Sequence, residues 1–407
     1  MECRSCGSTA LRPFLDLGVT PLADALVRPD RLDAPEERFP LEVAFCKECA
    51  LVQILEEVPA EKLFVENYLY FSSFSDVLLD HARSHAEGLI AARDLGPDSL
   101  VVELASNDGY LLKNFVEVGI PVLGIDPAPD QAAAALEAGV PTLKEFFGIE
   151  MAHRLVVDGK PADVIIANNV LAHVPDLNGF VAGMAVLLAD DGLITVENPY
   201  VRSLIDHCEF DTIYHEHFCY YSCTSIDNLM RRHGMWLNDV EYFPDLHGGT
   251  LRYHIGKREQ RSDTVLSYLA EEREIGLDTA EYYAAFSERV TSVRNRLIEL
   301  LGNLQADGAS VAGYGAAAKG STLLNYVGIG RDLIDYVVDR NVHKHGTFMP
   351  GTHQPVLDTT ALVERQPDYV VLLAWNFAEE IVAQQRDYLE AGGKFILPVP
   401  EPAVAYG

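Results

Sequence analysis

The sequence predicts an α/β protein of several domains, with a small cysteine-rich module at its N-terminus and two open α/β units after it. The chain has 407 residues, which is more than one ordinary core holds. Two C-x-x-C pairs stand near its start, and strand–loop–helix patterns begin near residues 99 and 310. Hydrophobic residues make up 48% of the chain, enough to fill more than one core.

The cysteine-rich module contains two C-x-x-C pairs, formed by Cys3, Cys6, Cys46 and Cys49. Each pair can place two thiolates at one corner of a tetrahedral zinc site, and two pairs complete it. A redox pair or four unrelated buried thiols are the alternatives. The paired spacing favours Zn²⁺ in a structural role, because four thiolates leave no open position. We therefore predict a β-rich zinc-binding domain over residues 1–60.

The first α/β unit begins with an apolar strand at 99–104, followed by a turn that opens a helix. A second strand at 122–125 ends in Asp126, where a carboxylate can accept both hydroxyls of a ribose. The loop between them is acidic, and it lacks the three glycines that a dinucleotide needs. Such a loop favours S-adenosylmethionine, which carries a sulfonium and an ammonium but no phosphate. A turn without a ligand is the alternative.

Further alternation supports an open α/β sheet in a central domain over residues 61–257. We expect strands at 163–167 and 192–197, with a helix from residue 177 between them. The predicted cofactor-binding residues lie at the strand ends and in the acidic loop: Glu103, Ser106, Asn107, Asp108, Gly109, Asp126 and Asn168.

The second α/β unit defines a C-terminal domain over residues 258–407. Its first strand leads into a loop of small residues that contains Gly315 and ends with Lys319. A helix N-terminus beside an ammonium group can bind an anion, although the motif differs from a Walker A loop. Tight packing of strand and helix is the alternative. Arg340 and Lys344 follow the next strand, and together these residues favour a phosphorylated or nucleotide-linked ligand.

Between the two units lies the run Tyr214-His215-Glu216-His217-Phe218, which concentrates groups that transfer protons near neutral pH. A histidine metal site, or a polar patch within a core, is the alternative. The cysteine pairs give zinc a better site. Strand-like alternation would turn His215 away from His217, so we expect a supporting role for His215.

The formal net charge of −30 argues against nucleic acid or an anionic membrane surface as a partner. We see no signal peptide and no apolar run long enough to span a bilayer. The expected location is the cytoplasm, where cysteines are reduced or metal-bound. The sequence leaves the oligomeric state open, a monomer included.

Taken in order, these motifs resemble the sugar C-methyltransferases that act on nucleotide-linked 4-ketosugars. The resemblance covers nearly the whole chain. It rests on the cysteine pairs, E-x-x-S-N-D-G-Y at 103–110, Y-H-E-H-F-x-Y-Y-S at 214–222, H-G-G-T-L-R at 247–252 and G-Y-G-A-x-A-K-G at 313–320. It implies a zinc domain, a central Rossmann-like class I methyltransferase domain and a C-terminal Rossmann-like domain that binds the nucleotide-sugar.

The resemblance also implies a reaction and a site. A methyl group passes from S-adenosylmethionine to a ring carbon next to the C4 ketone, most often C3, and thymidine is the commonest nucleotide. His217 is the implied base, with Tyr214 and Glu216 orienting it or contacting the sugar. Tyr68 is implied to face the sugar, with Tyr70 as the second choice. The further candidate substrate contacts are Tyr221 and the second-loop residues Gly315, Lys319, Arg340 and Lys344.

Some side chains near the site have weaker assignments. We expect Tyr220 and Tyr221 to form pocket wall, and His173 to have a structural role. Two other functions stay open: an O- or N-methyltransferase of a small metabolite, which needs no second anion loop, and a non-catalytic zinc-containing protein that senses a ligand.

Overall fold

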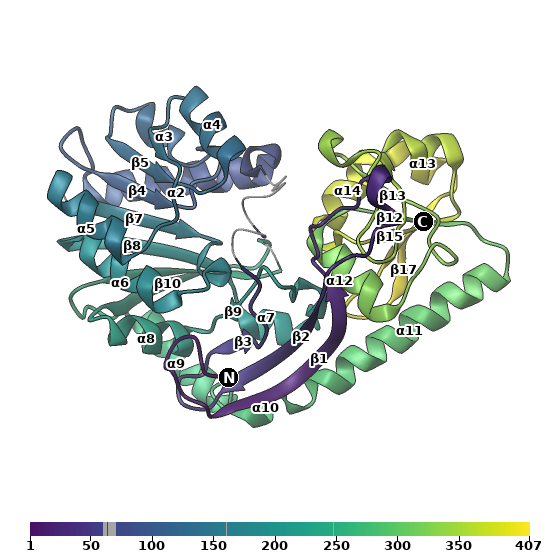
Figure 1. The fold of residues 1–407 in the computed structure, drawn as a ribbon, viewed down its shortest axis with the longest axis horizontal. Coiled ribbons are helices and arrows are strands. Elements are labelled where there is room, and N and C mark those ends of the chain that lie inside the picture. The colour runs from purple at the N-terminus through teal and green to yellow at the C-terminus, as the bar shows by residue number, and fades with distance from the viewer. Residues whose placement is uncertain (60–62, 64–70, 160, 247) are drawn as a thin grey trace.

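The computed structural model describes residues 1–59, 63, 71–159, 161–246 and 248–407. Tyr68 and Tyr70 lie outside the described residues. Figure 1 shows two lobes side by side, with strands β1 (Leu11–Pro21) and β2 (Arg38–Cys46) and the long helix α11 (Phe286–Ala306) running beneath them. Among the described residues, the strands form three sheets.

The N-terminal sheet is antiparallel, with the order β1-β2-β3-β9. It contains β3 (Val52–Ile54), and the 3₁₀ turn η1 (Pro29–Arg31) lies between β1 and β2. Its last strand, β9 (Cys219–Tyr220), comes from the segment directly after the Tyr214 run. A β-rich N-terminal module was predicted. That this sheet would include a strand from the predicted central domain was not predicted.

The central sheet has the order β10-β11-β8-β7-β4-β5-β6, parallel from β8 to β6 and antiparallel at β10 and β11. Its strands are β4 (Val101–Leu104), β5 (Val122–Ile125), β6 (Thr142–Leu143), β7 (Ala162–Asn168), β8 (Leu188–Pro199), β10 (Trp236–Phe243) and β11 (Thr250–Gly256). The helices of this part are α2 (Asp76–Arg93), α3 (Lys113–Val116), α4 (Pro129–Glu137), α5 (Ile149–Asp158), α6 (Leu177–Leu187), α7 (Val201–Asp206) and α8 (Cys223–Arg232). The expected strands are confirmed, whereas β10 was not predicted.

The C-terminal sheet has the order β14-β13-β12-β15-β16-β17, and only β17 pairs antiparallel. Its strands are β12 (Val311–Tyr314), β13 (Val337–Asp339), β14 (Val356–Asp358), β15 (Tyr369–Leu372), β16 (Lys394–Leu397) and β17 (Ala403–Tyr406). The helices here are α12 (Ala318–Val327), α13 (Thr360–Arg365), α14 (Ala378–Gln384) and α15 (Arg386–Glu390), whereas α9 (Asp263–Glu274) packs against α8 and β10, and α10 (Ala280–Ala284) against β1 and β2. The α/β fold with two Rossmann-like units is therefore confirmed.

Local sequence explains where the helices beside the site begin and end. The Ser75 hydroxyl accepts the Leu78 N–H at the start of α2, and Ser222 and Ser225 form a reciprocal capping box at α8. Helix α12 ends at Gly328, whose φ of 84° is in the left-handed region that glycine adopts without strain.

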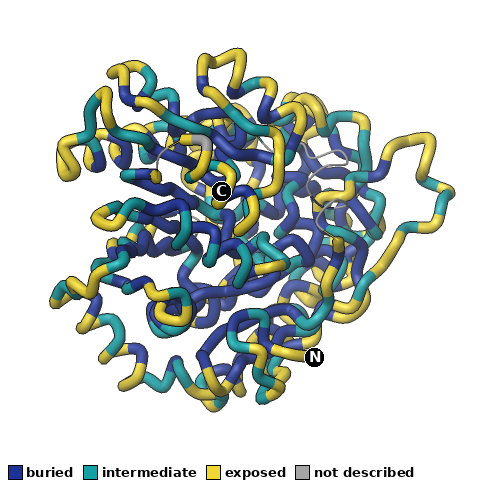
Figure 2. The backbone as a smooth tube through the Cα atoms, turned by 60° about the vertical axis from the view of Figure 1, so that its left-hand side comes forward, coloured by how far each residue is buried: buried dark blue, intermediate teal, exposed yellow. Residues whose placement is uncertain are grey.

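The core is continuous from the N-terminal sheet into the helices beneath it. The ring of Phe45 stacks on that of Tyr283 with centroids 4.9 Å apart, and Phe14 lies 5.0 Å from the same tyrosine. Figure 2 shows the buried segments running through the middle of the molecule. The N-terminal module is thereby packed against α10 and α11. The predicted domain limits stay predictions.

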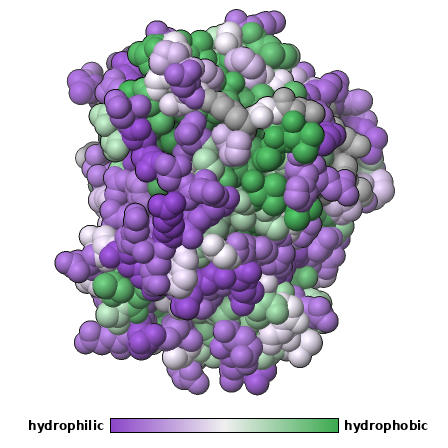
Figure 3. Space-filling view, turned by 90° about the vertical axis from the view of Figure 1, so that its left-hand side faces the viewer, coloured by the Kyte–Doolittle hydropathy of each residue, from purple (hydrophilic) through white to green (hydrophobic). Residues whose placement is uncertain are grey.

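Polar side chains cover most of the face in Figure 3, interrupted by an apolar area. Among the described residues, no helix is both long and apolar enough to cross a membrane.

Candidate active site

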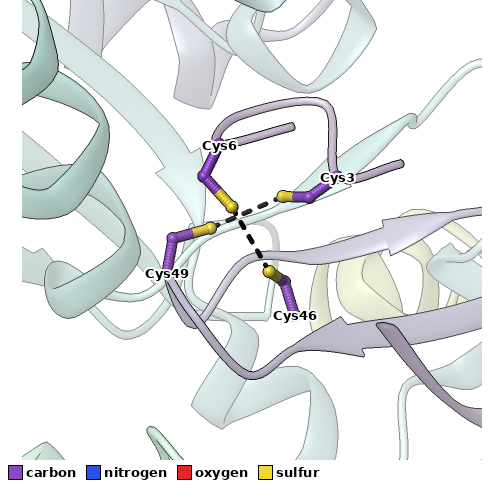
Figure 4. Close-up of side chains that lie close together, drawn as sticks. All are labelled: Cys3, Cys6, Cys46 and Cys49. Carbon is purple, nitrogen blue, oxygen red and sulfur yellow. Dashed lines mark hydrogen bonds between the residues drawn. The ribbon is translucent and has the colours of Figure 1, made fainter. Parts of the chain in front are cut away.

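The four paired cysteines meet at one end of the N-terminal sheet. Their Sγ atoms all lie within 4.8 Å of one another, with 3.5 Å between Cys3 and Cys49 and 3.6 Å between Cys6 and Cys46 (Figure 4). A tetrahedral zinc ion with bonds of about 2.3 Å needs sulfur atoms about 3.8 Å apart. The four thiols therefore fit Zn²⁺ in a closed, structural site, as predicted.

The acidic loop lies where β4 ends and folds back onto β5. The Asp126 carboxylate accepts the N–H groups of Asn107 and Ala128, each at 2.8 Å. Asn107 and Gly109 have φ values of 50° and 77°, and a Cβ on Gly109 would lie 3.0 Å from Val140. The loop is thereby held tightly against the end of the second strand.

The segment before α2 covers this loop. At η2 (Ser72–Phe74), the N–H of Ser72 donates to Oδ1 of Asn107 at 3.0 Å, and the N–H of Ser73 donates to Asp108 at 3.1 Å. These bonds fix two side chains of the predicted cofactor set, and they join α2 to the edge of the sheet.

Buried oxygens at this edge have no hydrogen-bond partner among the described residues. They are Oε2 of Glu103, Oγ of Ser106, Oδ1 of Asp108 and Oδ1 of Asn168. Each can accept a hydrogen bond, and S-adenosylmethionine offers donors in its ammonium, ribose hydroxyls and adenine amino group. Burial raises the pKa of Glu103 well above its ordinary value, and the charges of Asp126 and Asp108 add to the effect. The edge therefore fits a cationic ligand rich in donors.

The Tyr214 run forms a turn between η4 (Phe210–Thr212) and β9, so the expectation of a strand there was wrong. His217 Nδ1 lies 3.0 Å from the carbonyl oxygen of Thr212, which can only accept, so Nδ1 carries the proton. His217 Nε2 lies 3.0 Å from the hydroxyl of Tyr214. In the neutral ring the lone pair on Nε2 accepts that O–H, and the imidazole is held in one tautomer.

His173 lies at η3 (Leu171–His173), with its ring centroid 4.7 Å from that of His217. Its Nδ1 donates to the carbonyl of Glu216 at 2.7 Å, which supports the expected structural role. Burial lowers the pKa of His173 to about 4, so this ring is neutral at neutral pH.

The Glu216 side chain turns toward Asp24 of the N-terminal module. Burial raises the pKa of Glu216 well above its ordinary value, and the neighbouring Asp24 carboxyl contributes further. Asp24 in turn faces Lys344 and Asp339 of the C-terminal unit. Sequence reasoning missed Asp24, because a lone aspartate outside any motif gives no signal.

His215 and Tyr221 support the run from behind. Nε2 of His215 donates to the carbonyl of Pro40 at 3.1 Å, which agrees with its expected supporting role. The Tyr221 hydroxyl donates to the carbonyl of Leu171 at 2.9 Å, and its side chain is buried. The hydroxyl of Tyr221 therefore braces the backbone at η3, and the expectation that Tyr221 lines a pocket stays a prediction.

The second loop repeats the geometry of the first. Asp339 accepts the N–H groups of Ala316 and Asn341, each at 2.8 Å. Lys344 Nζ donates to the carbonyl of Ala316 at 2.7 Å and lies 3.7 Å from Asp339. Gly315 has a φ of 100°. The predicted residues Gly315 and Lys344 therefore lie at one site.

Lys319 and Arg340 lie differently from Lys344. Lys319 donates to Oδ1 of Asn376 at 2.7 Å and sits 4.6 Å from the ring centroid of Trp375. Burial lowers its pKa, and the charges of Asp211 and Glu209 oppose that effect. Arg340 is exposed and pairs with Glu380 at 3.0 Å.

A buried ion-pair cluster near the first loop was not assigned from the sequence. Glu197, at the end of β8, accepts from Arg252 at 2.6 Å and lies 3.0 Å from Nε2 of His81. Burial alone would raise the pKa of Glu197, but the hydrogen bond from His81 and the charge of Arg252 lower it to about 2. The cluster ties α2 to the sheet. The sequence feature that could have revealed the cluster is Arg252, the last residue of the H-G-G-T-L-R motif.

The fold and site define an S-adenosylmethionine-dependent methyltransferase with a structural zinc site. Family models match three consecutive parts of the chain: a zinc binding domain at residues 3–64, a methyltransferase domain at 81–237 and a C-methyltransferase C-terminal domain at 245–400. C-methyltransferase NovU of Streptomyces niveus is 36% identical over 406 residues, 99% of this chain and 96% of that protein. The chain belongs to this C-methyltransferase family.

More distant relatives match a smaller share of the chain. A ubiquinone biosynthesis O-methyltransferase of Methylobacterium sp. (strain 4-46) is 31% identical over 128 residues, 30% of this chain and 50% of that protein. The magnesium protoporphyrin IX methyltransferase (ChlM) from Synechocystis PCC 6803 with bound SAH is 15% identical, with a TM-score of 0.36 over 44% of this chain and 83% of that one.

Proposed function

We propose that this C-methyltransferase acts on a nucleotide-diphospho-4-ketosugar, with thymidine as the expected nucleotide, and methylates C3, next to the C4 ketone. The observation that carries the proposal is the geometry of His217. Its Nδ1–H is fixed on the carbonyl of Thr212, so Nε2 is the basic nitrogen, and it faces the Tyr214 hydroxyl. A base in one tautomer beside a neutral donor is what enolate formation requires.

Bound S-adenosylmethionine supplies the methyl group as an electrophile. The residues of the chain have to make the carbon nucleophilic. His217 Nε2 takes the C3 proton, and the electron pair of the broken C–H bond moves into the enolate, whose charge collects on O4. Tyr214 must release Nε2 when the sugar enters, and its hydroxyl is then a donor for O4. Glu216, Tyr68 and Tyr70 keep their predicted roles.

The second loop supports an anionic substrate carrier. Asp339 occupies the position that suits ribose hydroxyls, and Lys344 lies directly beside it. An ammonium group at a tight strand–helix turn favours phosphate. A small-molecule O- or N-methyltransferase would not need this second loop.

A location in the cytoplasm stays a prediction.

The test is deuterium wash-in from heavy water, followed by NMR of a thymidine-diphospho-4-keto-6-deoxyhexose. We expect exchange at C3 in the native enzyme and its loss in His217→Ala. His153→Ala makes the same change at an exposed histidine on α5 and serves as the matched control. Exchange at C5 in place of C3 would change the proposed site of methylation from C3 to C5. Exchange that persists in His217→Ala, or no exchange and no methyl transfer with any 4-ketosugar, would reject the proposal.

A further inference from the structure

A hydrogen bond joins the C-terminal unit to the segment that holds His217. The indole Nε1 of Trp375, at η6 (Trp375–Phe377), donates to Oδ2 of Asp211 at 2.7 Å. Asp211 lies in η4, is fully buried, and its other oxygen has no hydrogen-bond partner among the described residues. We propose that Trp375 and Asp211 are positioning residues that orient His217 for proton abstraction. This inference rests on the proposed role of His217 as the base.

The connection runs through a single peptide. Thr212 follows Asp211, and its carbonyl is the group that accepts Nδ1–H of His217 at 3.0 Å. The Thr212 hydroxyl donates to the carbonyl of Glu209 at 2.7 Å, which closes the turn. Anchoring the Asp211 side chain therefore fixes the direction of the Thr212 carbonyl. That direction determines where Nε2 of His217 points, because the two ring nitrogens are rigidly related.

The anchor belongs to the second ligand loop. Trp375 directly follows Ala374, and a Cβ on Gly315 would lie 2.6 Å from the Cβ of Ala374. Phe210 of η4 packs against Tyr326 of α12, the helix that this loop opens, with centroids 5.2 Å apart. The loop proposed to bind the nucleotide and the turn that orients the base are thus one packed unit.

Charge holds the same interface together. Lys319 of α12 lies over the Trp375 ring, and its charge interacts with Asp211 of η4 and with Glu209, the residue before η4. Burial raises the pKa of Asp211 to about 6, an effect that Lys319 and the Trp375 hydrogen bond oppose. An uncompensated carboxylate here would be costly, so the indole N–H and the ammonium together make the contact stable.

The chain contains two tryptophans, which provides a matched control. Trp236 lies on β10, with Arg231 and Arg261 stacked on its ring at 4.9 and 5.5 Å. It takes no part in η4 or the second loop. Trp375→Phe keeps an aromatic ring for Lys319 but removes the N–H donor, and Trp236→Phe makes the same chemical change elsewhere.

We expect Trp375→Phe to lower kcat about tenfold or more, as for the loss of a hydrogen bond to a charged group, with KM for the ketosugar changed less than about threefold. The C3 exchange rate should fall by the same factor, and Trp236→Phe should match the native enzyme in both. Asp211→Ala should repeat the loss. Asp211→Asn, which keeps an acceptor for the indole, should keep most of the activity. The double variant Trp375→Phe/Asp211→Ala should lose little more than either single variant, because both act through one contact.

A kcat of Trp375→Phe equal to that of Trp236→Phe, in an assay where His217→Ala is inactive, would overturn the inference and leave the proposed function standing. Exchange that survives in His217→Ala would instead remove the proposed function. Should Trp375→Phe fail to fold, the Asp211 pair decides: equal kcat in Asp211→Ala and Asp211→Asn would overturn the inference, and loss in Asp211→Ala alone would support it.

Discussion

The central and C-terminal units use the same backbone device with opposite charge around it. In each, an aspartate at the end of the second strand accepts an N–H from the first loop and another from two residues further along the chain. The third residue of the first strand differs: it is buried Glu103 in β4 and Gly313 in β12. Lys344 stands beside the second aspartate.

We infer from this difference that the strand–loop–strand frame provides a place for a ribose, whereas the neighbouring charges select the rest of the ligand. Within the part of the chain that the structure describes, acceptors without a hydrogen-bond partner surround the first loop, which suits the cationic methyl donor. Glycine and lysine at the second loop suit an anion. Charge at two or three side chains is therefore what separates the two sites, and each can be changed without the other.

The largest expected effect is a crossed loss of binding at the two aspartates. Asp126→Ala removes the acceptor for two backbone N–H groups and for ribose hydroxyls, so we expect S-adenosylmethionine affinity to fall about 100-fold. Asp339→Ala should weaken nucleotide-sugar binding by a similar factor and leave the methyl donor unaffected. Isothermal titration calorimetry with each ligand measures both.

Melting temperatures of the two variants provide the control, because both aspartates also brace their loops. The comparison of the two units fails if either variant loses affinity for both ligands equally while staying folded.

The elements that form each site were predictable from sequence to different degrees. Strands such as 122–125 were correct because continuous apolar runs between turn residues signal buried parallel strands. The cysteine site followed from spacing alone. Strand β9 and the turn at 214–217 were not predictable, because long-range pairing with β3 overrides the local pattern.

The contacts that join the modules could not be predicted from any local sequence pattern. Trp375 reaches Asp211 across 164 positions of sequence, and Asp24 reaches Glu216 from the N-terminal module. Residue types at motif positions reveal the chemistry of a site. The partners that orient those residues depend on tertiary packing, and a single sequence does not encode them in any short pattern.

The first loop of the C-terminal unit requires a glycine at position 315. Gly315 has a φ of 100°, and a Cβ there would approach Ala374 to 2.6 Å. Gly315→Ala should therefore cost about 2 kcal/mol of unfolding free energy, from backbone strain and steric overlap together. Urea denaturation measures it. Gly328 has a similar φ of 84°, but a Cβ there would meet no atom within 4 Å. Gly328→Ala should therefore cost only about 1 kcal/mol of unfolding free energy. Equal losses of unfolding free energy in the two variants would show that the chain around Ala374 moves aside for the added methyl group.

Lys344 should matter for the anionic ligand alone. Lys344→Met keeps the apolar stem but removes the ammonium beside Asp339, so we expect KM for the nucleotide-sugar to rise about tenfold. The rise should shrink in higher salt, because the lost term is electrostatic. Arg340→Met, which removes an exposed cation paired with Glu380, should change KM less than about twofold. Equal effects of the two variants would mean that overall charge, not a site, attracts the substrate.

The smallest effect concerns a proton at the first loop. Burial raises the pKa of Glu103, so its contribution to the stability of the ligand-free protein is present below its ordinary pKa and is lost as pH rises through the raised value. A bound sulfonium and ammonium favour the ionised carboxylate and lower that pKa again. Binding of S-adenosylmethionine should therefore release protons in the window between the two values, and its affinity should increase with pH there.

Titration calorimetry in buffers of different ionisation enthalpy counts these protons. Glu103→Gln should abolish the release and weaken binding about fivefold, whereas Glu87→Gln, at an exposed position on α2, should change neither. Gly313 replaces the acid in the second unit, so the nucleotide-sugar should bind without this release. Uptake of protons on binding of the methyl donor, or release that persists in Glu103→Gln, would mean that the acidic character of the first loop does not select its ligand.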